Sequence, residues 1–165
     1  MSQRDAIVAE IPGLRRYARA LTGEAARADD LVQDTLERAL AKWSLWRPGN
    51  LRAWLFSIMH NVFVNQLRST RAIDYVEDPG ELAAGVPPAH EDAAMVRDLE
   101  RALAKLPTEQ REVLLLIGLE ELGYAEAAKA LGVPVGTIMS RLSRGRERLR
   151  VMLRGEAGNS LRVVK

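Results

Sequence analysis

The sequence contains no cysteine, few aromatic residues and no long apolar segment, and each absence excludes a class of protein. Without cysteine there are no disulfides and no thiolate metal sites. The longest stretch free of formal charge, residues 53–67, includes a histidine and three amide side chains, so it is too short and too polar to cross a bilayer. The opening residues do not resemble a signal peptide, because Arg4, Asp5 and Glu10 interrupt any apolar run. These features favour a cytoplasmic protein without a membrane segment.

Patterns typical of catalysis and of cofactor binding are also missing. The two histidines, His60 and His90, lie in different segments, and there is neither a glycine loop that could hold phosphate nor a spacing of metal ligands. We therefore expect no enzyme: no catalytic residue, no cofactor, no metal and no small-molecule substrate.

Helix-forming residues dominate what is present. Alanine, leucine, arginine and glutamate are abundant, and no segment alternates apolar and polar residues as a half-buried strand does. A chain of 165 residues holds one ordinary domain or two small ones. The sequence predicts an all-α protein.

An acidic segment divides the chain. Residues 73–92 contain six acidic residues, no basic ones, three prolines and two glycines, which is typical of a flexible linker. Eleven basic and seven acidic residues precede it, and thirteen basic and nine acidic residues follow it. We expect two small helical domains, residues 1–72 and 93–155, joined by this linker and followed by a tail at 156–165.

Residues 124–150 carry the pattern of a DNA-binding helix-turn-helix. Gly132 can end a first short helix, and Pro134 can begin a second one. Eight basic and two acidic residues lie from Thr137 to the end of the chain. Apolar residues follow one face of the second helix, and the other face carries Thr137, Ser140, Arg141, Arg144 and Arg148. Such a helix can be an ordinary solvated one, but the paired-helix context favours binding to DNA.

The first domain is expected to hold three main helices. The first is expected to break near Pro12 and Gly13. The second, residues 24–43, displays acidic side chains beyond its first turn, and Asn50 is a plausible N-cap for the third. The third is apolar on nearly every side. Either the domain buries Trp54, Phe56, Met59 and Phe63, or such aromatic residues hold unpaired bases by stacking.

The second domain opens with a helix on which Val96, Leu99, Leu103 and Leu106 form the apolar stripe, and Pro107 stops it. Thr108 can then cap the next helix.

Four segments, in this order, make the chain resemble an extracytoplasmic-function sigma factor, a two-domain specificity subunit of bacterial RNA polymerase. They are ADDLVQDTLERAL, LRAWLFSIMHNVFVNQLR, LAKLPTEQREVLLL and GVPVGTIMSRLSRGRERLR. The opening residues look most similar to the general-stress-response members of alphaproteobacteria. Met139, where many members carry Lys or Arg, and Gly145, where alanine is usual, depart from the pattern.

The resemblance implies three sets of site residues. The set that binds the core polymerase is Asp30, Gln33, Asp34 and Glu37. The set that reads the minus-ten element as melted strand is Trp46, Arg47, Asn50, Asn61, Asn65 and Arg68. The set that reads the minus-thirty-five element in the major groove is Thr137, Ser140, Arg141, Arg144 and Arg148. The implied partners are core RNA polymerase, promoter DNA and an anti-sigma factor.

Two alternatives stay open. A helix-turn-helix repressor or activator shares the paired helices, and its first domain would sense a ligand or dimerise. An adaptor that mimics a sigma factor would bind an anti-sigma protein without touching DNA. The arginines on the second helix of the helix-turn-helix argue against the adaptor. The aromatic third helix of the first domain argues against the repressor.

Overall fold

A computed structural model describes residues 2–46, 49–73 and 91–163, and the side chains of residues 2–46, 49–69 and 93–155. These residues form helices and turns only, which confirms the all-α prediction. The predicted linker lies almost entirely outside the described residues. Within them, no helix is long and apolar enough to cross a membrane.

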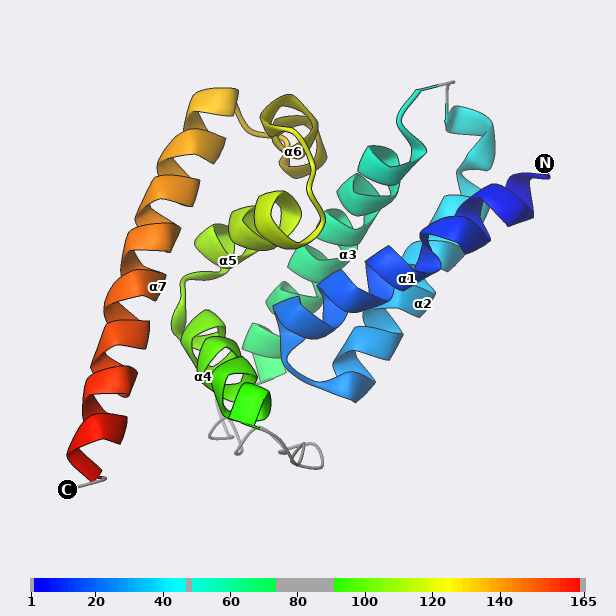
Figure 1. Cartoon of the computed structure of the whole chain (residues 1–165). Helices are drawn as coiled ribbons and strands as arrows, with labels where there is room; N and C mark the ends of the chain where they lie inside the picture. The colour runs from blue at the N-terminus through cyan, green and yellow to red at the C-terminus, as the bar shows by residue number, and fades with distance from the viewer. Residues whose placement is uncertain (1, 47–48, 74–90, 164–165) are drawn as a thin grey trace.

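The first three helices form one packed unit (Figure 1). Its elements are α1 (Gln3–Thr22), α2 (Ala25–Ala41), the 3-10 turn η1 (Trp43–Leu45) and α3 (Leu51–Ile73). Helix α2 packs against both α1 and α3. The buried side chains include Leu14, Leu21, Leu31 and Leu55, which occupy the space between the three helices.

Helix α1 runs through Pro12 without a break, so the predicted interruption is wrong. Proline lacks one helical hydrogen bond, but the flanking turns hold the helix together. Ser2 and Asp5 form a capping box at its start, and Ile7 and Leu14 are buried on either side of the proline. The predicted end is confirmed, because Gly23 adopts the left-handed conformation that closes the helix.

The remaining helices form the second unit. Its elements are α4 (Glu91–Lys105), α5 (Thr108–Leu114), the π-helical turn η2 (Leu115–Leu119), α6 (Tyr124–Leu131) and α7 (Val135–Val163). Helix α7 is the longest and packs against α4, α5 and α6 (Figure 1). Arg111 ties α4 to α5, because its guanidinium donates to the carbonyls of Leu103, Ala104 and Leu106. Burial lowers the pKa of Arg111.

Two local predictions for this unit are corrected. The apolar stripe of α4 is only partly buried: Leu103 and Leu106 are inside, whereas Val96 and Leu99 are 50% and 39% exposed. Ala102, beside Leu103 in the chain, is fully buried. Pro107, not Thr108, is the N-cap residue of α5, and no side chain caps that end.

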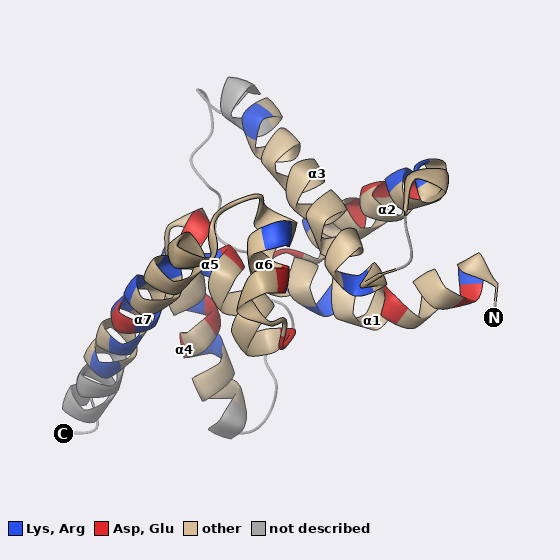
Figure 2. Cartoon of the chain, turned by 90° about the horizontal axis from the view of Figure 1, so that it is seen from above, with Lys and Arg blue, Asp and Glu red and all other residues tan. Residues whose placement is uncertain are grey.

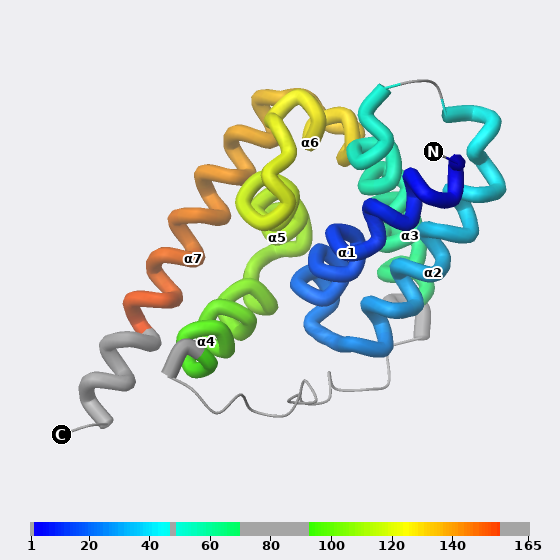
Figure 3. The backbone as a smooth tube through the Cα atoms, turned by 45° about the vertical axis from the view of Figure 1, so that its right-hand side comes forward, coloured from blue at the N-terminus to red at the C-terminus, as the bar shows by residue number. Residues whose placement is uncertain are grey.

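The two units pack against each other instead of standing apart. Helix α6 packs against α3, and α1 contacts α4 and η2. Figure 3 shows the two units side by side. The buried apolar residues of both units belong to one connected cluster, in which Phe56 and Met59 of α3 join Leu116 and Ala127 of the second unit. The described part of the chain is therefore a single packed body.

Candidate nucleic-acid interface

The predicted helix-turn-helix is formed by α6 and α7. Gly132 ends α6 with a φ of +67°, which glycine adopts without steric cost, and its amide donates to the carbonyl of Ala128. Ala128 is buried, as are Ile138 and Leu142 on one face of α7. This packing fixes α7 against the domain by its apolar face and turns its polar face outward.

The outward face of α7 carries the predicted minus-thirty-five residues. Ser140, Arg144 and Arg148 are exposed, and Thr137 is half-buried. Arg141 is the most constrained, because its side chain is 24% exposed and its Nη2 lies 3.6 Å from Oε2 of Glu109. Figure 2 shows the basic residues following one another along this helix. The face therefore combines a concentrated positive charge with hydroxyl donors, a combination suited to phosphates and base edges.

Gly145 has a structural reason to replace a larger residue. A Cβ atom at this position would lie 3.0 Å from Cδ1 of Leu114 and 3.4 Å from Cβ of Gln110. The glycine is buried and permits α5 to approach α7 closely. This departure from the family pattern thus belongs to the packing beneath the recognition helix.

All three tryptophans of the chain form one cluster at the N-terminal end of α3. The ring centroids of Trp43 and Trp46 lie 5.0 Å apart, and Trp54 lies 6.2 Å from Trp43 and 6.4 Å from Trp46. All three side chains are half-buried. Trp46 was predicted as a site residue, whereas the partnership with Trp43 was missed, because Trp43 falls within the predicted helix 24–43; in the structure it lies in η1.

The other predicted minus-ten residues follow α3. Asn50 is its N-cap: the side-chain oxygen accepts a hydrogen bond from the amide of Ala53 at 3.1 Å, which confirms that structural prediction. Asn61, Asn65 and Arg68 are exposed farther along the helix. Arg47 lies outside the described residues.

The stacking role suggested for the whole aromatic helix is wrong for Phe56, Met59 and Phe63, which are 2%, 0% and 6% exposed. Phe56 packs edge-on against Tyr17 at 5.0 Å between centroids. These side chains form core contacts and cannot reach a base. Among the described aromatic side chains of the first domain, those of the tryptophan cluster alone stay partly exposed.

The predicted polymerase-binding residues share helix α2. Asp30, Gln33 and Glu37 are exposed, and Gln33 donates to Glu37 at 3.4 Å. Asp34 is half-buried and accepts a hydrogen bond of 3.0 Å from Gln66 of α3. Gln66 was not predictable as its partner, because the bond joins residues of two helices that are 32 positions apart in the chain.

Comparison with known proteins defines the class. A family model described as the sigma2 domain of PhyR matches residues 7–60, and one described as sigma-70 region 4 matches residues 97–149. The first match covers most of α1, all of α2, the tryptophan cluster and part of α3. The second covers most of the second unit, including α6 and the exposed face of α7. The fold is thus that of a two-domain sigma factor.

Individual relatives specify the family. The chain is 44% identical over 156 residues to the ECF RNA polymerase sigma factor EcfG of Rhodopseudomonas palustris, and the match covers 92% of this chain and 85% of that one. The structure is similar to that of the sigma factor RpoE of Bartonella quintana in complex with the anti-sigma factor NepR. That similarity has a TM-score of 0.81 and 36% identity, and it covers 92% and 96% of the two chains.

A further solved structure, CnrH in complex with the cytosolic domain of CnrY, has a TM-score of 0.69 and 28% identity, covering 93% of this chain and 90% of that one. The chain belongs to the extracytoplasmic-function sigma factors, which direct promoter-specific initiation of transcription. The similarity to the alphaproteobacterial stress-response type is confirmed as well.

Proposed function

We propose that this sigma factor divides its task between its two domains. The first, residues 1–72, binds core RNA polymerase through α2 and holds the melted minus-ten strand. The second, residues 93–155, docks on the duplex minus-thirty-five element. The chain itself has no catalytic role and acts in the cytoplasm. The observation that carries the proposal is the exposed basic face of α7 on a helix-turn-helix whose other face is packed into the domain.

Duplex reading by α7 is supported by the positions of its cations. Arg144 and Arg148 are exposed one helical turn apart, so both can reach the same stretch of groove. A recognition helix makes base contacts from its N-terminal part, where Thr137, Ser140 and Arg141 lie. Glu109 holds Arg141 at the edge of that face.

Reading of the melted strand is supported by the tryptophan cluster and the exposed polar residues of α3. Extruding a base costs a few kcal/mol, so a pocket that compensates this cost only for the correct base couples recognition to strand opening. The three half-buried rings can support the loop at Trp46 and Asn50, and Asn61, Asn65 and Arg68 supply donors and charge.

Core polymerase binding by α2 is supported by its acidic and amide side chains. Most of them lie beyond the first turn, where they would complement the helix dipole, and they are not part of the apolar core. Asp30, Gln33 and Glu37 are exposed on the helix, and Asp34 is oriented by Gln66. We also propose an anti-sigma factor as a partner, because the RpoE and CnrH relatives are described in complexes with NepR and CnrY.

Transcription from a cognate promoter tests the proposal. Purified chain with core polymerase should produce a specific transcript, and Arg141→Ala with Arg144→Ala should abolish the dependence of that transcript on the minus-thirty-five sequence. The double variant should still bind core polymerase as the wild type does. A double variant that loses polymerase binding would contradict the division of labour. Tight binding of the chain alone to a duplex operator, without any transcript, would favour the repressor.

A further inference from the structure

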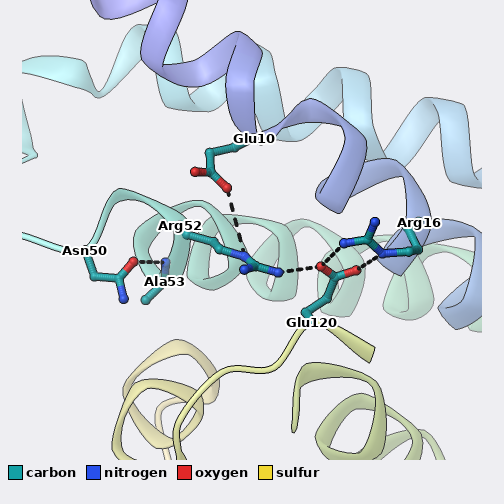
Figure 4. Close-up of polar contacts among 6 residues, drawn as sticks. All are labelled: Glu10, Arg16, Asn50, Arg52, Ala53 and Glu120. Carbon is teal, nitrogen blue, oxygen red and sulfur yellow. Dashed lines mark hydrogen bonds and ion pairs between the residues drawn. The ribbon is translucent and has the colours of Figure 1, made fainter. Parts of the chain in front are cut away.

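A buried carboxylate lies where the two domains meet. Glu120, directly after η2, has no exposed side-chain surface. Its Oε1 accepts from Nε of Arg16 at 2.9 Å, and its Oε2 accepts from Nη2 of Arg16 at 2.8 Å and from Nη2 of Arg52 at 2.6 Å. Figure 4 shows the two guanidinium groups approaching this carboxylate from α1 and α3. One side chain of the second domain therefore joins two helices of the first.

The surrounding backbone is shaped for this contact. A Cβ atom on Gly13 would lie 3.2 Å from Oε2 of Glu120, so the glycine leaves room for the carboxylate beside α1. Glu121 has a φ of +58°, a conformation that non-glycine residues adopt at a cost. The π-helical turn η2 immediately precedes the pair. The chain thus departs from regular helix at the point where it presents Glu120.

Two further contacts cross the same interface. Nδ1 of His60 lies 3.0 Å from Oε2 of Glu112, and both side chains are largely buried. Arg111 donates to the carbonyl of Leu21 at 3.0 Å. The Tyr17 phenol is also enclosed here, and its pKa is raised by burial and then by the charges of Glu112 and Glu120. The interface therefore contains several ionisable groups.

Charged groups of this kind fix geometry more than they add stability. The desolvation of a buried ion pair roughly offsets its attraction, but a buried charge left without its partner is strongly unfavourable. When the domains separate, water can solvate Glu120 and both arginines. The contact thus has a specific geometry in the closed form. When it opens, charged groups that water can solvate are exposed together with apolar surface.

The closed form is too small for both promoter elements. The element names place their centres about 25 base pairs apart, which is roughly 85 Å of duplex. A compact chain of this length has a radius of gyration of about 15 Å, hence a diameter of ~40 Å. The domains have to separate before α7 and α3 can occupy the two elements together.

We propose that Glu120, with Arg16 and Arg52, is an intramolecular latch that holds the two domains closed and opens when the protein binds core polymerase. The closed form is then a competing state, and its population lowers the apparent affinity for the polymerase. The closed-state contact stands on the geometry alone, whereas its release by polymerase rests on the proposed function.

Single-molecule energy transfer tests the latch without polymerase. Because the chain has no cysteine, Ser44→Cys and Ser143→Cys place one dye on each domain at exposed positions. Wild-type protein should give one high-transfer population. Glu120→Gln keeps the shape of the side chain but removes its charge, and should raise the ratio of open to closed molecules at least tenfold. Glu121→Gln, an exposed neighbour with the same change of charge, should match the wild type.

The same transfer distribution for Glu120→Gln and Glu121→Gln would overturn the latch. If Glu120→Gln fails to fold by circular dichroism, the double variant Arg16→Gln with Arg52→Gln replaces it, with the same two outcomes. With core polymerase, Glu120→Gln should bind severalfold more tightly than Glu121→Gln, and equal affinity would contradict the role of the latch in polymerase binding. Failure of every variant to bind polymerase would contradict the proposed function but leave the transfer result standing.

Discussion

Asn50 is a residue at which fold and predicted function coincide. Its side chain caps α3, and the same residue belongs to the predicted minus-ten set. Asn61, from that set, is exposed on the helix surface. A loss of promoter activity on changing Asn50 would therefore combine a weaker helix cap with a lost promoter contact. The stability of the variant has to be measured separately.

Asn50→Ala should lower the free energy of unfolding by about 1 kcal/mol, because it leaves an amide of the first turn of α3 without its side-chain acceptor. Asn50→Asp should retain most of the stability, since aspartate caps equally well. Asn61→Ala should change stability little. Urea unfolding followed by circular dichroism measures all three, and an Asn61→Ala loss as large as that of Asn50→Ala would contradict the assignment.

Single residues also mark the limit of prediction from sequence. Asn50 and Gly132 were predictable, because caps depend on neighbours in the chain. Glu120 and Gly145 were not, because their roles arise from groups on other helices: the arginines at positions 16 and 52, and Leu114. Nothing in the local sequence distinguishes Glu120, which is buried, from Glu121, which is exposed.

Among the elements, the tryptophan cluster provides its own probe. The chain has no other tryptophan, so its intrinsic fluorescence reports on this cluster alone. A single strand carrying the minus-ten sequence should quench that emission when bases stack on the rings, with stacking contributing about 1–3 kcal/mol per base. The titration is followed at low salt, and anisotropy of a labelled strand verifies binding. Saturated binding with unchanged emission would exclude the cluster from the contact.

Helix α2 makes a separate prediction. Asp34→Lys should weaken association with core polymerase roughly tenfold at moderate salt, because it replaces an attractive charge by a repulsive one. Asp29→Lys, an exposed residue of the same helix outside the predicted set, is the control with an equal change of charge. Gln66→Ala tests the partner of Asp34. Unchanged affinity of Asp34→Lys for core polymerase would show that Asp34 is not part of the interface. If Gln66→Ala weakens binding as much as Asp34→Lys does, the loss comes from disturbed packing between α2 and α3.

The positions of the helices could be predicted well from apolar periodicity and capping residues. Which face of each helix is buried could be predicted less well. The recognition helix and its outward arginines were predictable, since one apolar stripe requires one partner face. The breaking of α1 at Pro12 was predicted wrongly because burial on both sides outweighed one missing hydrogen bond. Val96 and Leu99 of α4 show the reverse error, because an apolar pattern does not reveal how wide the contact is.

For the whole molecule, composition indicated two helical domains and the family models match both. The packing of the domains on each other could not be predicted. It depends on residues that are far apart in the chain: Arg16 bonds to Glu120, and Phe56 and Met59 share one core cluster with residues of the second domain. Helix α3 is apolar on nearly every side, and part of its surface contacts the second domain.

Equilibrium binding of the full chain to core RNA polymerase tests the central claim most directly. The chain labelled on an introduced cysteine is titrated with core polymerase across a range of salt concentrations, and anisotropy reports the complex. The account predicts a saturable one-to-one complex that then selects a promoter and weakens as salt rises. No complex at any salt concentration would contradict it.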